Sequence, residues 1–244
     1  MKKVFSGVAL AILFAGPAVA QENAWTYDIS MNLWLTDTGV TADTPHGQVD
    51  AELSFSDALQ DLDFAFMGTV EARNGPWGII GDLNYFNLTA DGPSPAGIAY
   101  SEVAVGTKVT LLSGYLTYRV HQDDKIAVDL GGGFRSFWTS IDTTFVGASA
   151  PTTVLEQSKD WVDPVVAARI RFAFSDQWFG TLMFDAGGTG DTQTWQALAT
   201  VGYRINEHWL MQGGYRYIEA EWDTDYGQSS FDFSGPILGV TYSF

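Results

Sequence analysis

The last strand of the chain constrains the fold most. Residues 231–244 (FDFSGPILGVTYSF) alternate between two faces, and the chain ends on an aromatic residue. One face carries the larger apolar side chains, which are Pro236, Leu238, Val240, Tyr242 and Phe244. The other face carries Gly235, Ile237, Gly239, Thr241 and Ser243. A soluble protein has little reason to end on exposed aromatics, whereas the closing strand of a transmembrane β-barrel needs an apolar outer row with aromatics at the membrane interface.

The start of the chain has the pattern of a secretory signal peptide. Lys2 and Lys3 precede a short apolar core at 8–14, and Ala18-Val19-Ala20 forms a cleavage site. The core is too short to cross a bilayer as a helix. We therefore predict a cleaved signal peptide at 1–20 and a single outer-membrane β-barrel domain at 21–244. The destination is the outer membrane of a Gram-negative cell envelope.

Composition narrows the chemistry further. The chain has no cysteine, so neither disulfides nor thiolate metal sites are available, and we expect no cofactor. A formal net charge of −17 excludes nucleic-acid binding through the general field of the protein.

Period-two segments separated by turn signals predict an all-β, closed, antiparallel, up-and-down barrel of about ten strands. The first nine strands are predicted at 25–35, 62–73, 77–88, 102–120, 125–144, 160–175, 178–186, 193–205 and 208–222, and 231–244 closes the barrel. The even number of strands places both termini on the periplasmic side, and the short turns at 74–76, 121–124, 175–177 and 206–207 then fall on that side. Eight strands is an alternative, as is twelve if 49–55 pairs as a hairpin. A soluble β-sandwich fits less well, because aromatic residues recur at the outward strand ends.

The phase of the strand at 102–120 is ambiguous. Val103, Val105 and Val109 share one parity, whereas Leu112 and Leu116 share the other. We predict a β-bulge near 111–112, which would reconcile the two rows. Arg119 and Lys108 would both face the lumen only if that bulge exists.

Charged residues of the predicted strands lie opposite the apolar row, which predicts a charge network in the lumen. Its members are Asp28, Asp63, Glu71, Arg73, Asp82, Asp129, Arg135, Asp163, Arg169, Arg171, Asp185, Arg204 and Arg216. A charge on the lipid face would cost about 2–4 kcal/mol at mid-bilayer, which explains the segregation. The network either fills the lumen with ion pairs or forms a charged constriction that selects a small polar solute.

The long connection at 36–61 carries Ser56, which could cap a single helical turn. The segment either folds into the mouth and narrows it or, by default, forms an ordered surface loop. Acidic residues cluster near the predicted outer rim, including Glu219, Glu221 and Asp223. They form either a solvated rim or a divalent-cation bridge to lipid phosphates.

Enzyme chemistry has little support in the sequence. The three histidines are His46, His121 and His208, and the last two fall at predicted periplasmic turns. His46 could reach the outer rim, where an omptin-like hydrolase would need a histidine beside carboxylates. No motif flanks it, so we expect no catalytic residues, no metal site and no enzymatic activity.

The chain resembles the small outer-membrane β-barrel domains of Gram-negative bacteria, a porin-like and little-characterised group. The segments that carry the resemblance are 62–88, 160–172 (DWVDPVVAARIRF), 194–209 (TWQALATVGYRINEHW), 214–217 (GYRY) and 234–244 (SGPILGVTYSF). The final strand is similar to the signature that the barrel-assembly machinery recognises, which implies that Tyr242 and Phe244 act as an assembly signal.

The resemblance implies an integral outer-membrane protein without a defined substrate. Its expected partners are outer-membrane lipid, lipopolysaccharide, the barrel-assembly machinery and periplasmic chaperones, with no nucleic acid. The oligomeric state stays open. We expect either a small passive pore for ions or small polar solutes, or a structural envelope protein. The alternative is a rim-located hydrolase that uses His46.

Overall fold

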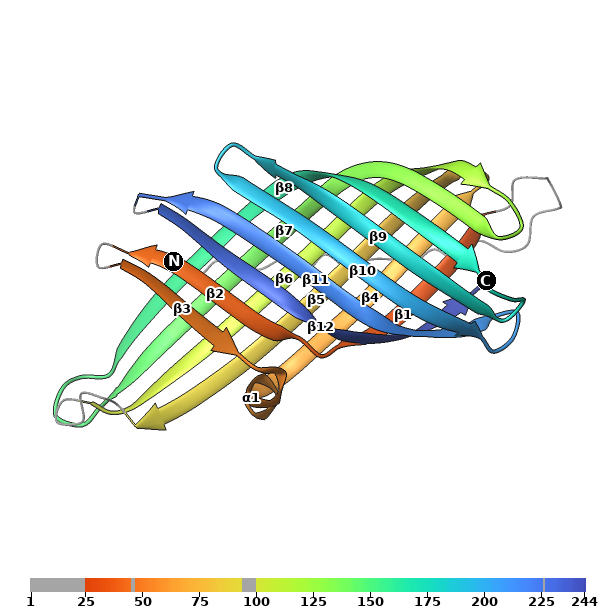
Figure 1. The fold of residues 1–244 in the computed structure, drawn as a ribbon. Coiled ribbons are helices and arrows are strands. Elements are labelled where there is room, and N and C mark those ends of the chain that lie inside the picture. The colour runs from red at the N-terminus through yellow and green to blue at the C-terminus, as the bar shows by residue number, and fades with distance from the viewer. Residues whose placement is uncertain (1–24, 45–46, 94–99, 226) are drawn as a thin grey trace.

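The computed structural model describes residues 25–44, 47–93, 100–225 and 227–244 (Figure 1). The predicted signal peptide at 1–20 and His46 lie outside the described residues. Among those that are described, no helix is both long enough and apolar enough to cross a membrane.

Ten strands form a closed antiparallel barrel, which confirms the predicted fold class (Figure 1). They are β1 (Thr26–Trp34), β4 (Leu62–Asn74), β5 (Trp77–Pro93), β6 (Tyr100–Gln122), β7 (Ile126–Gly147), β8 (Thr153–Ala173), β9 (Trp178–Thr189), β10 (Thr192–Arg204), β11 (Trp209–Thr224) and β12 (Gly227–Ser243). Each strand pairs with the next one, and β1 closes the ring by pairing with both β4 and β12.

The first and last strands meet in a register that keeps both apolar rows outside. Met31 lies opposite Val240 on β12 and opposite Gly68 on β4. Below this pair, the backbone of Tyr27 exchanges two hydrogen bonds of 2.9 Å with Phe244. The terminal aromatic residue is therefore part of the closure of the barrel.

A hairpin outside the ring accounts for the ambiguity between ten and twelve strands. β2 (Asp37–Thr44) continues the direction of β1 and pairs with the outer half of β12, and β3 (Gly47–Leu53) pairs with β2. The sheet therefore has twelve strands, of which ten close the barrel. The added hairpin lengthens the wall at the end opposite the short turns (Figure 1).

The helical turn in the long connection begins two residues earlier than predicted. α1 (Phe55–Gln60) is capped by Ser54, whose hydroxyl accepts a hydrogen bond from the backbone amide of Asp57 at 3.3 Å. The prediction of Ser56 as the cap is wrong. Ser54 has the extended backbone that an N-cap requires, whereas Ser56 already lies within the helix.

The strands on one side of the barrel are longer than predicted. β5 continues to Pro93, past the predicted end at 88, and β8 begins at Thr153, before the predicted start at 160. The connection between β7 and β8 is reduced to 148–152, because Thr153 pairs with Phe145. β5 to β8 therefore extend as a wall well beyond the short-turn half of the barrel (Figure 1).

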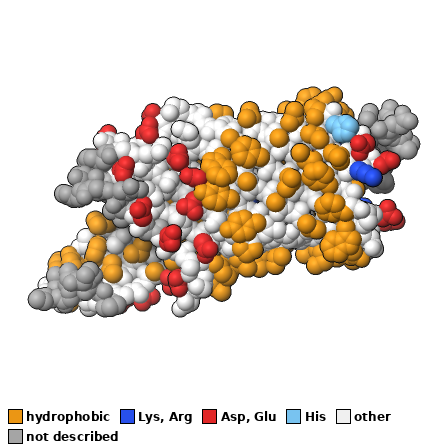
Figure 2. All heavy atoms as spheres, viewed as in Figure 1, with side chains coloured by type: hydrophobic (Ala, Val, Ile, Leu, Met, Phe, Trp, Pro, Cys, Tyr) orange, Lys and Arg blue, Asp and Glu red, His pale blue; other side chains and the backbone are white. Residues whose placement is uncertain are grey.

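An apolar belt covers the outside of the half that carries the short turns (Figure 2). Large outward side chains are exposed on every strand of the ring, for example Met31 at 63% and Val166 at 70%. At the short-turn end the belt carries aromatic pairs between neighbouring strands, with ring centroids 4.9–5.0 Å apart, at Trp77–Tyr118, Trp178–Tyr203 and Trp209–Tyr242.

The belt has the height of a membrane. On β5 it runs outward from Trp77 to Tyr85, whose ring packs 6.0 Å from that of Phe64. With a rise of ~3.3 Å per residue and a tilt of about 40°, these two aromatic positions are roughly 20 Å apart along the barrel axis. That height is close to the apolar band of about 25 Å expected of an outer-membrane barrel.

The predicted bulge at 111–112 is wrong. β5 and β6 pair in continuous register from Trp77–Tyr118 to Pro93–Glu102. Leu111 and Val109 therefore face the interior, where Leu111 is 2% exposed and Val109 packs beside it. Arg119 also faces the interior, whereas Lys108 lies on the opposite face and is exposed. The two apolar rows are real, but the row that contains Val109 and Leu111 faces the lumen, and the row that contains Leu116 faces outward.

Candidate functional site in the barrel lumen

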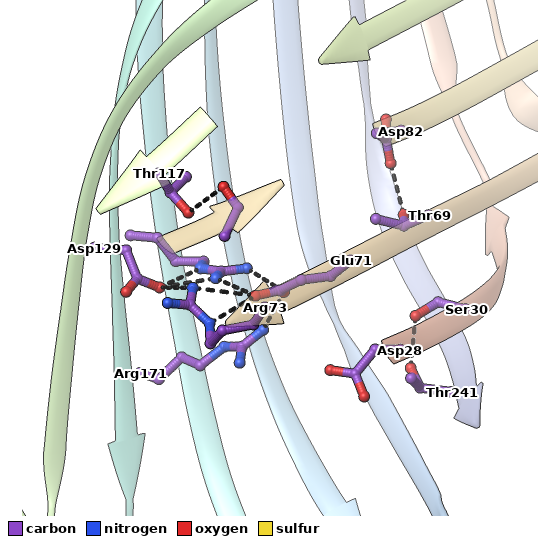
Figure 3. Close-up of polar contacts among 12 residues, drawn as sticks. Asp28, Ser30, Thr69, Glu71, Arg73, Asp82, Thr117, Asp129, Arg171 and Thr241 are labelled. Atoms are coloured by element: carbon purple, nitrogen blue, oxygen red, sulfur yellow. Dashed lines mark hydrogen bonds and ion pairs between the residues drawn. The ribbon is translucent and has the colours of Figure 1, made fainter. Parts of the chain in front are cut away.

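The charges nearest the short turns form one connected group, the turn-end cluster, which consists of Glu71, Arg73, Arg119, Asp129, Arg169 and Arg171. Figure 3 labels four of its members, Glu71, Arg73, Asp129 and Arg171. Glu71 and Arg73 come from β4, Arg119 from β6, Asp129 from β7, and the other two arginines from β8. Period-two alternation turns all of them inward, where they are shielded from lipid.

Glu71 and Asp129 are the two centres of this cluster. Arg169 binds Glu71 in a bidentate manner, with both nitrogen–oxygen distances at 2.8 Å, and also donates to Asp129 at 2.8 Å. Arg73 reaches Asp129 at 3.0 Å, and Arg119 reaches it at 2.8 Å. Arg171 makes one hydrogen bond to the described residues, at 2.8 Å to Glu71, and its side chain is 37% exposed. Forked arginine–carboxylate pairs of this kind fix geometry as well as charge.

A second polar group lies farther along the lumen and is completely buried. Arg135 binds both carboxylate oxygens of Asp185 at 2.8 and 3.0 Å, and both side chains are 0% exposed. The guanidinium also donates hydrogen bonds to three hydroxyl oxygens, those of Ser113, Tyr115 and Thr194. Such a pair is tolerated inside a protein only because every polar atom has a partner.

The neighbouring pair of Arg216 and Asp82 spans the lumen between β11 and β5 at 2.7 Å. Gln196 accepts two further hydrogen bonds from Arg216, at 2.7 and 2.9 Å, and donates to Asp185 at 2.8 Å. Gln196 therefore joins the two buried ion pairs into one layer across the barrel. Within the described residues, every fully buried side-chain nitrogen and oxygen has a hydrogen-bond partner.

Beyond this polar layer the lumen is filled by an apolar plug. Its buried members are Trp34, Met67, Leu111, Phe137, Ile218, Ala220, Phe233 and Ile237, none more than 7% exposed. Phe137 stacks on Trp161 with centroids 4.6 Å apart, and Trp34 packs 6.3 Å from Phe233. The Arg216 guanidinium lies over the Trp34 ring at 4.9 Å, so the plug rests directly on the polar layer.

On the short-turn side of the polar layer the lumen is hollow. A cavity of about 680 Å³ reaches from the turn residues at 122–126 and 206–210 to Asp82, Gln196 and Arg216. Glu71, Arg169 and Arg171 lie on one wall, and Ile80, Met183 and Leu198 provide an apolar wall. The cavity therefore opens at the short-turn end of the barrel and ends at the polar layer that lies beneath the plug.

The remaining residues of the predicted lumen network have varied positions. Asp28 lines the cavity and accepts a 2.6 Å hydrogen bond from the Ser243 hydroxyl. Asp163 is 0% exposed and accepts hydrogen bonds from Trp161 and Thr192. Asp63 and Arg204 are exposed and lie near opposite ends of the barrel. Asp63 accepts hydrogen bonds from Asn87 and Thr89, and Arg204 donates one to the backbone carbonyl of Asp176.

The histidines do not assemble a described catalytic site. His121 contacts Asp123 at 3.1 Å in an exposed turn, and His208 lies 2.9 Å from the Ser243 carbonyl oxygen. The backbone amides of Lys125 and Ile126, followed by His121, lower the pKa of Asp123 by hydrogen bonding to it. Across the described ranges, no group of three or more His, Asp or Glu side chains is arranged to hold a metal ion.

Acidic side chains gather outside the barrel, just beyond the apolar belt (Figure 2). Glu219, Glu221 and Asp232 belong to the outward rows of β11 and β12. Desolvation, and then repulsion by Glu219, raises the pKa of both Glu221 and Asp232.

Sequence reasoning missed the apolar plug. The inward parity of Trp34, Leu111 and Phe137 is readable from the alternation on their strands, so the signal was present. It was hidden by the assumption that the whole lumen is polar, and the apolar residues of the strand at 102–120 were therefore assigned to lipid.

No known protein family matches this sequence, and neither does any curated protein. Solved structures of outer-membrane β-barrel proteins do match it in shape. Ail, the attachment invasion locus protein of Yersinia pestis, is 10% identical over 92% of this chain and 100% of its own, with a TM-score of 0.40. The translocator domain of the autotransporter NalP from Neisseria meningitidis is 11% identical over 91% of this chain and 89% of its own, also at 0.40. The Pseudomonas putida toluene transporter TodX is 12% identical over 92% and 90%, at 0.34. This likeness is too distant to transfer any function, and the barrel assignment rests on the strand pairing itself.

Proposed function

We propose that this protein is an integral outer-membrane β-barrel with a lumen closed at rest, which serves as a structural component of the envelope. The observation that carries the proposal is the segregation of side chains. The outward positions of the belt are apolar and exposed, and charged groups turn inward to share hydrogen bonds. That arrangement is inverted relative to a soluble globule and fits a hydrocarbon surround.

The closed lumen is supported by the two layers that cross it. The Arg135–Asp185 layer and the apolar plug contain side chains that are 0–2% exposed, including Phe137 and Leu111. A steady ion path needs a continuous wet passage, and a packed apolar segment excludes water from its length.

Partition and conductance measurements test the proposal. The refolded mature polypeptide should require detergent or lipid to stay monomeric and folded, and in a planar bilayer it should give no steady unitary conductance. A folded monomer freely dissolved without detergent would end the membrane assignment. Steady conductance of the unmodified protein would instead establish the passive pore.

A gated pore is the second candidate, because the 680 Å³ cavity already occupies the short-turn part of the lumen. Variants that shorten side chains of the apolar plug distinguish the gated pore from the permanently closed barrel. Phe137→Ala together with Leu111→Ala should produce conductance if the plug is the barrier. The exposed Trp138→Ala, adjacent to Phe137 but outward at 42% exposure, serves as the matched control and should remain silent.

The outer surface of the barrel also suggests which partners surround the protein in the membrane. The belt would contact outer-membrane lipid, and the acidic row beyond it would face lipopolysaccharide. A cleaved signal peptide would direct export, and periplasmic chaperones would carry the chain to the outer membrane. There the barrel-assembly machinery would recognise Tyr242 and Phe244 at the end of the last strand. Deletion of Phe244 should slow assembly in reconstituted assembly reactions, and an unchanged rate would refute that role.

We propose no enzymatic role. The rim-hydrolase alternative depends on His46, so its test is functional: the purified barrel should cleave neither peptide nor lipid substrates. Cleavage that disappears in His46→Ala would revive the alternative.

A further inference from the structure

The turn-end cluster holds more positive than negative charge. Four guanidinium groups share the carboxylates of Glu71 and Asp129. Two positive charges are therefore left over, in a chain whose formal net charge is −17. Asp28 also lines the cavity, apart from the cluster and without an ion pair to any described residue (Figure 3). Three further carboxylates, Asp123, Asp124 and Glu207, line the cavity at the short turns. An excess of fixed cations beside a cavity with a partly apolar lining attracts an anion.

Arg171 is the cluster member with donors to spare. A guanidinium offers five N–H donors, and Arg171 uses one of them, in its hydrogen bond to Glu71. By contrast, Arg169 divides four hydrogen bonds between Glu71 and Asp129. Arg171 is also the most exposed arginine of the cluster, at 37%, and it lines the cavity. Its planar fork matches the oxygen spacing of a carboxylate or phosphate group.

The cavity wall beyond Arg171 is apolar on β9 and β10, although Thr181, the β9 partner of Arg171, is polar. Met183 pairs directly with Arg169 across β8 and β9, and it pairs with Leu198 across β9 and β10. Ile80 and Tyr115 belong to one buried apolar group, and Met183 packs against that group. A cavity of about 680 Å³ is within the ~300–1,000 Å³ range of small-molecule sites, and such sites combine apolar walls with a few convergent polar groups.

We propose that this cavity binds a small organic anion that enters from the short-turn end. The carboxylate or phosphate group of the ligand binds Arg171, and its hydrocarbon part packs against Ile80, Met183 and Leu198. Asp28 limits affinity by repelling the anionic group. The site does not depend on conduction, so a barrel that is silent in a bilayer retains it.

The test is a binding titration with the full mature barrel in lipid nanodiscs, with benzoate as the probe, benzamide as its neutral analogue and empty nanodiscs as the blank. Benzoate should bind the barrel at least about tenfold more tightly than benzamide, the difference expected of a charge-assisted contact. Inorganic phosphate, which lacks a hydrocarbon part, should bind more weakly than benzoate and compete with it.

Variants then assign the binding to Arg171. Arg171→Gln should weaken benzoate binding about tenfold and leave benzamide unchanged, while Arg171→Lys should retain part of the affinity. Lys108→Gln makes the same charge change on the outward row of β6 and should have no effect. Asp28→Asn should strengthen benzoate binding, an effect opposite to that of structural damage.

Three results would overturn the site. They are no benzoate binding above empty nanodiscs, equal affinity for benzoate and benzamide, or unchanged benzoate affinity in folded Arg171→Gln. If Arg171→Gln fails to fold, the Asp28→Asn titration decides, because unchanged or weaker binding there also contradicts the proposal.

Discussion

The two halves of the lumen are built from the same alternating strands but differ in what their inward rows contain. Toward the short turns the inward rows are charged, and a cavity remains among them. Toward the long hairpins they are aromatic and aliphatic, and the plug fills the space. The completely buried Arg135–Asp185 pair lies between the two halves.

This contrast shows that strand alternation determines which residues face the lumen. The chemical nature of those residues determines whether the lumen is packed or hollow. Ion pairs are held at fixed geometry by directional hydrogen bonds, and they leave gaps that water or a solute can occupy. Apolar side chains pack without directional demands and exclude water. The first half is therefore suited to binding, and the second to closing the lumen.

The largest expected effect comes from the boundary between the halves. Arg135→Met leaves Asp185 buried without its charge partner and should lower the free energy of unfolding by about 3–5 kcal/mol. The measurement is urea unfolding in lipid vesicles. Combining Arg135→Met with Asp185→Leu removes both charges and should recover much of the loss. A double variant that is as unstable as the single one would contradict the view that the isolated charge causes the damage.

Removing volume from the plug should cost somewhat less. Phe137→Ala deletes a completely buried ring stacked on Trp161 and should lower the free energy of unfolding by about 3 kcal/mol. The same urea measurement applies. Trp138→Ala removes a larger side chain from the outward face and should cost less, because that side chain leaves no internal cavity. Equal losses for the two variants would argue against a packed plug.

Within the charged half, two arginines of one strand should behave differently. Arg169 is 8% exposed and central to the cluster, whereas Arg171 is 37% exposed. Arg171→Gln should therefore lower the free energy of unfolding by about 1 kcal/mol or less, and Arg169→Gln by clearly more. Unfolding curves of the two variants, compared side by side, check this. Reversed losses would mean that Arg171 belongs to the structural core of the cluster.

The smallest expected effect is a pH response at the long-hairpin end. Burial and repulsion raise the pKa of Glu221 and Asp232 above the usual value. An acid with a raised pKa in the folded state contributes stability that is present below its unfolded pKa and is lost as pH rises through the folded value. Acidification from neutral pH should therefore raise the protection factors for hydrogen exchange in the β11–β12 hairpin, which are exchange rates relative to the intrinsic rate at the same pH. Glu221→Gln should reduce that response, and an unchanged response in this variant would contradict the assignment.

The outer face of the barrel could be predicted from sequence because lipid imposes one simple rule on every outward residue. Met31, Val166 and Val240 fall on outward rows that the alternation alone identifies. Strand ends were predicted less well. Thr153 at the start of β8, for example, is held by a pairing with Phe145 that local composition does not indicate.

The interior could be predicted only in part, because its contacts cross the barrel. Alternation turns Glu71 and Arg169 inward, but it cannot reveal that residues 98 positions apart in sequence bind each other at 2.8 Å. Alternation also does not reveal the position of each side chain along the barrel axis. The division of the lumen into a charged half and an apolar half was therefore not predicted. That axial position depends on the stagger between strands, which side-chain pattern does not encode.

The most direct test of the closed lumen uses cysteine substitutions, since the chain has no cysteine of its own. Single variants at Ser30 and Gln212, which line the cavity, should react rapidly with a small membrane-impermeant thiol reagent in lipid nanodiscs, where the reagent reaches both ends of the barrel. Variants at Leu111 and Ala220, which are 2% and 1% exposed in the plug, should be protected until the barrel unfolds. Similar labelling rates at all four positions would mean that water passes through the lumen, and would contradict the division of the barrel into an open half and a sealed half.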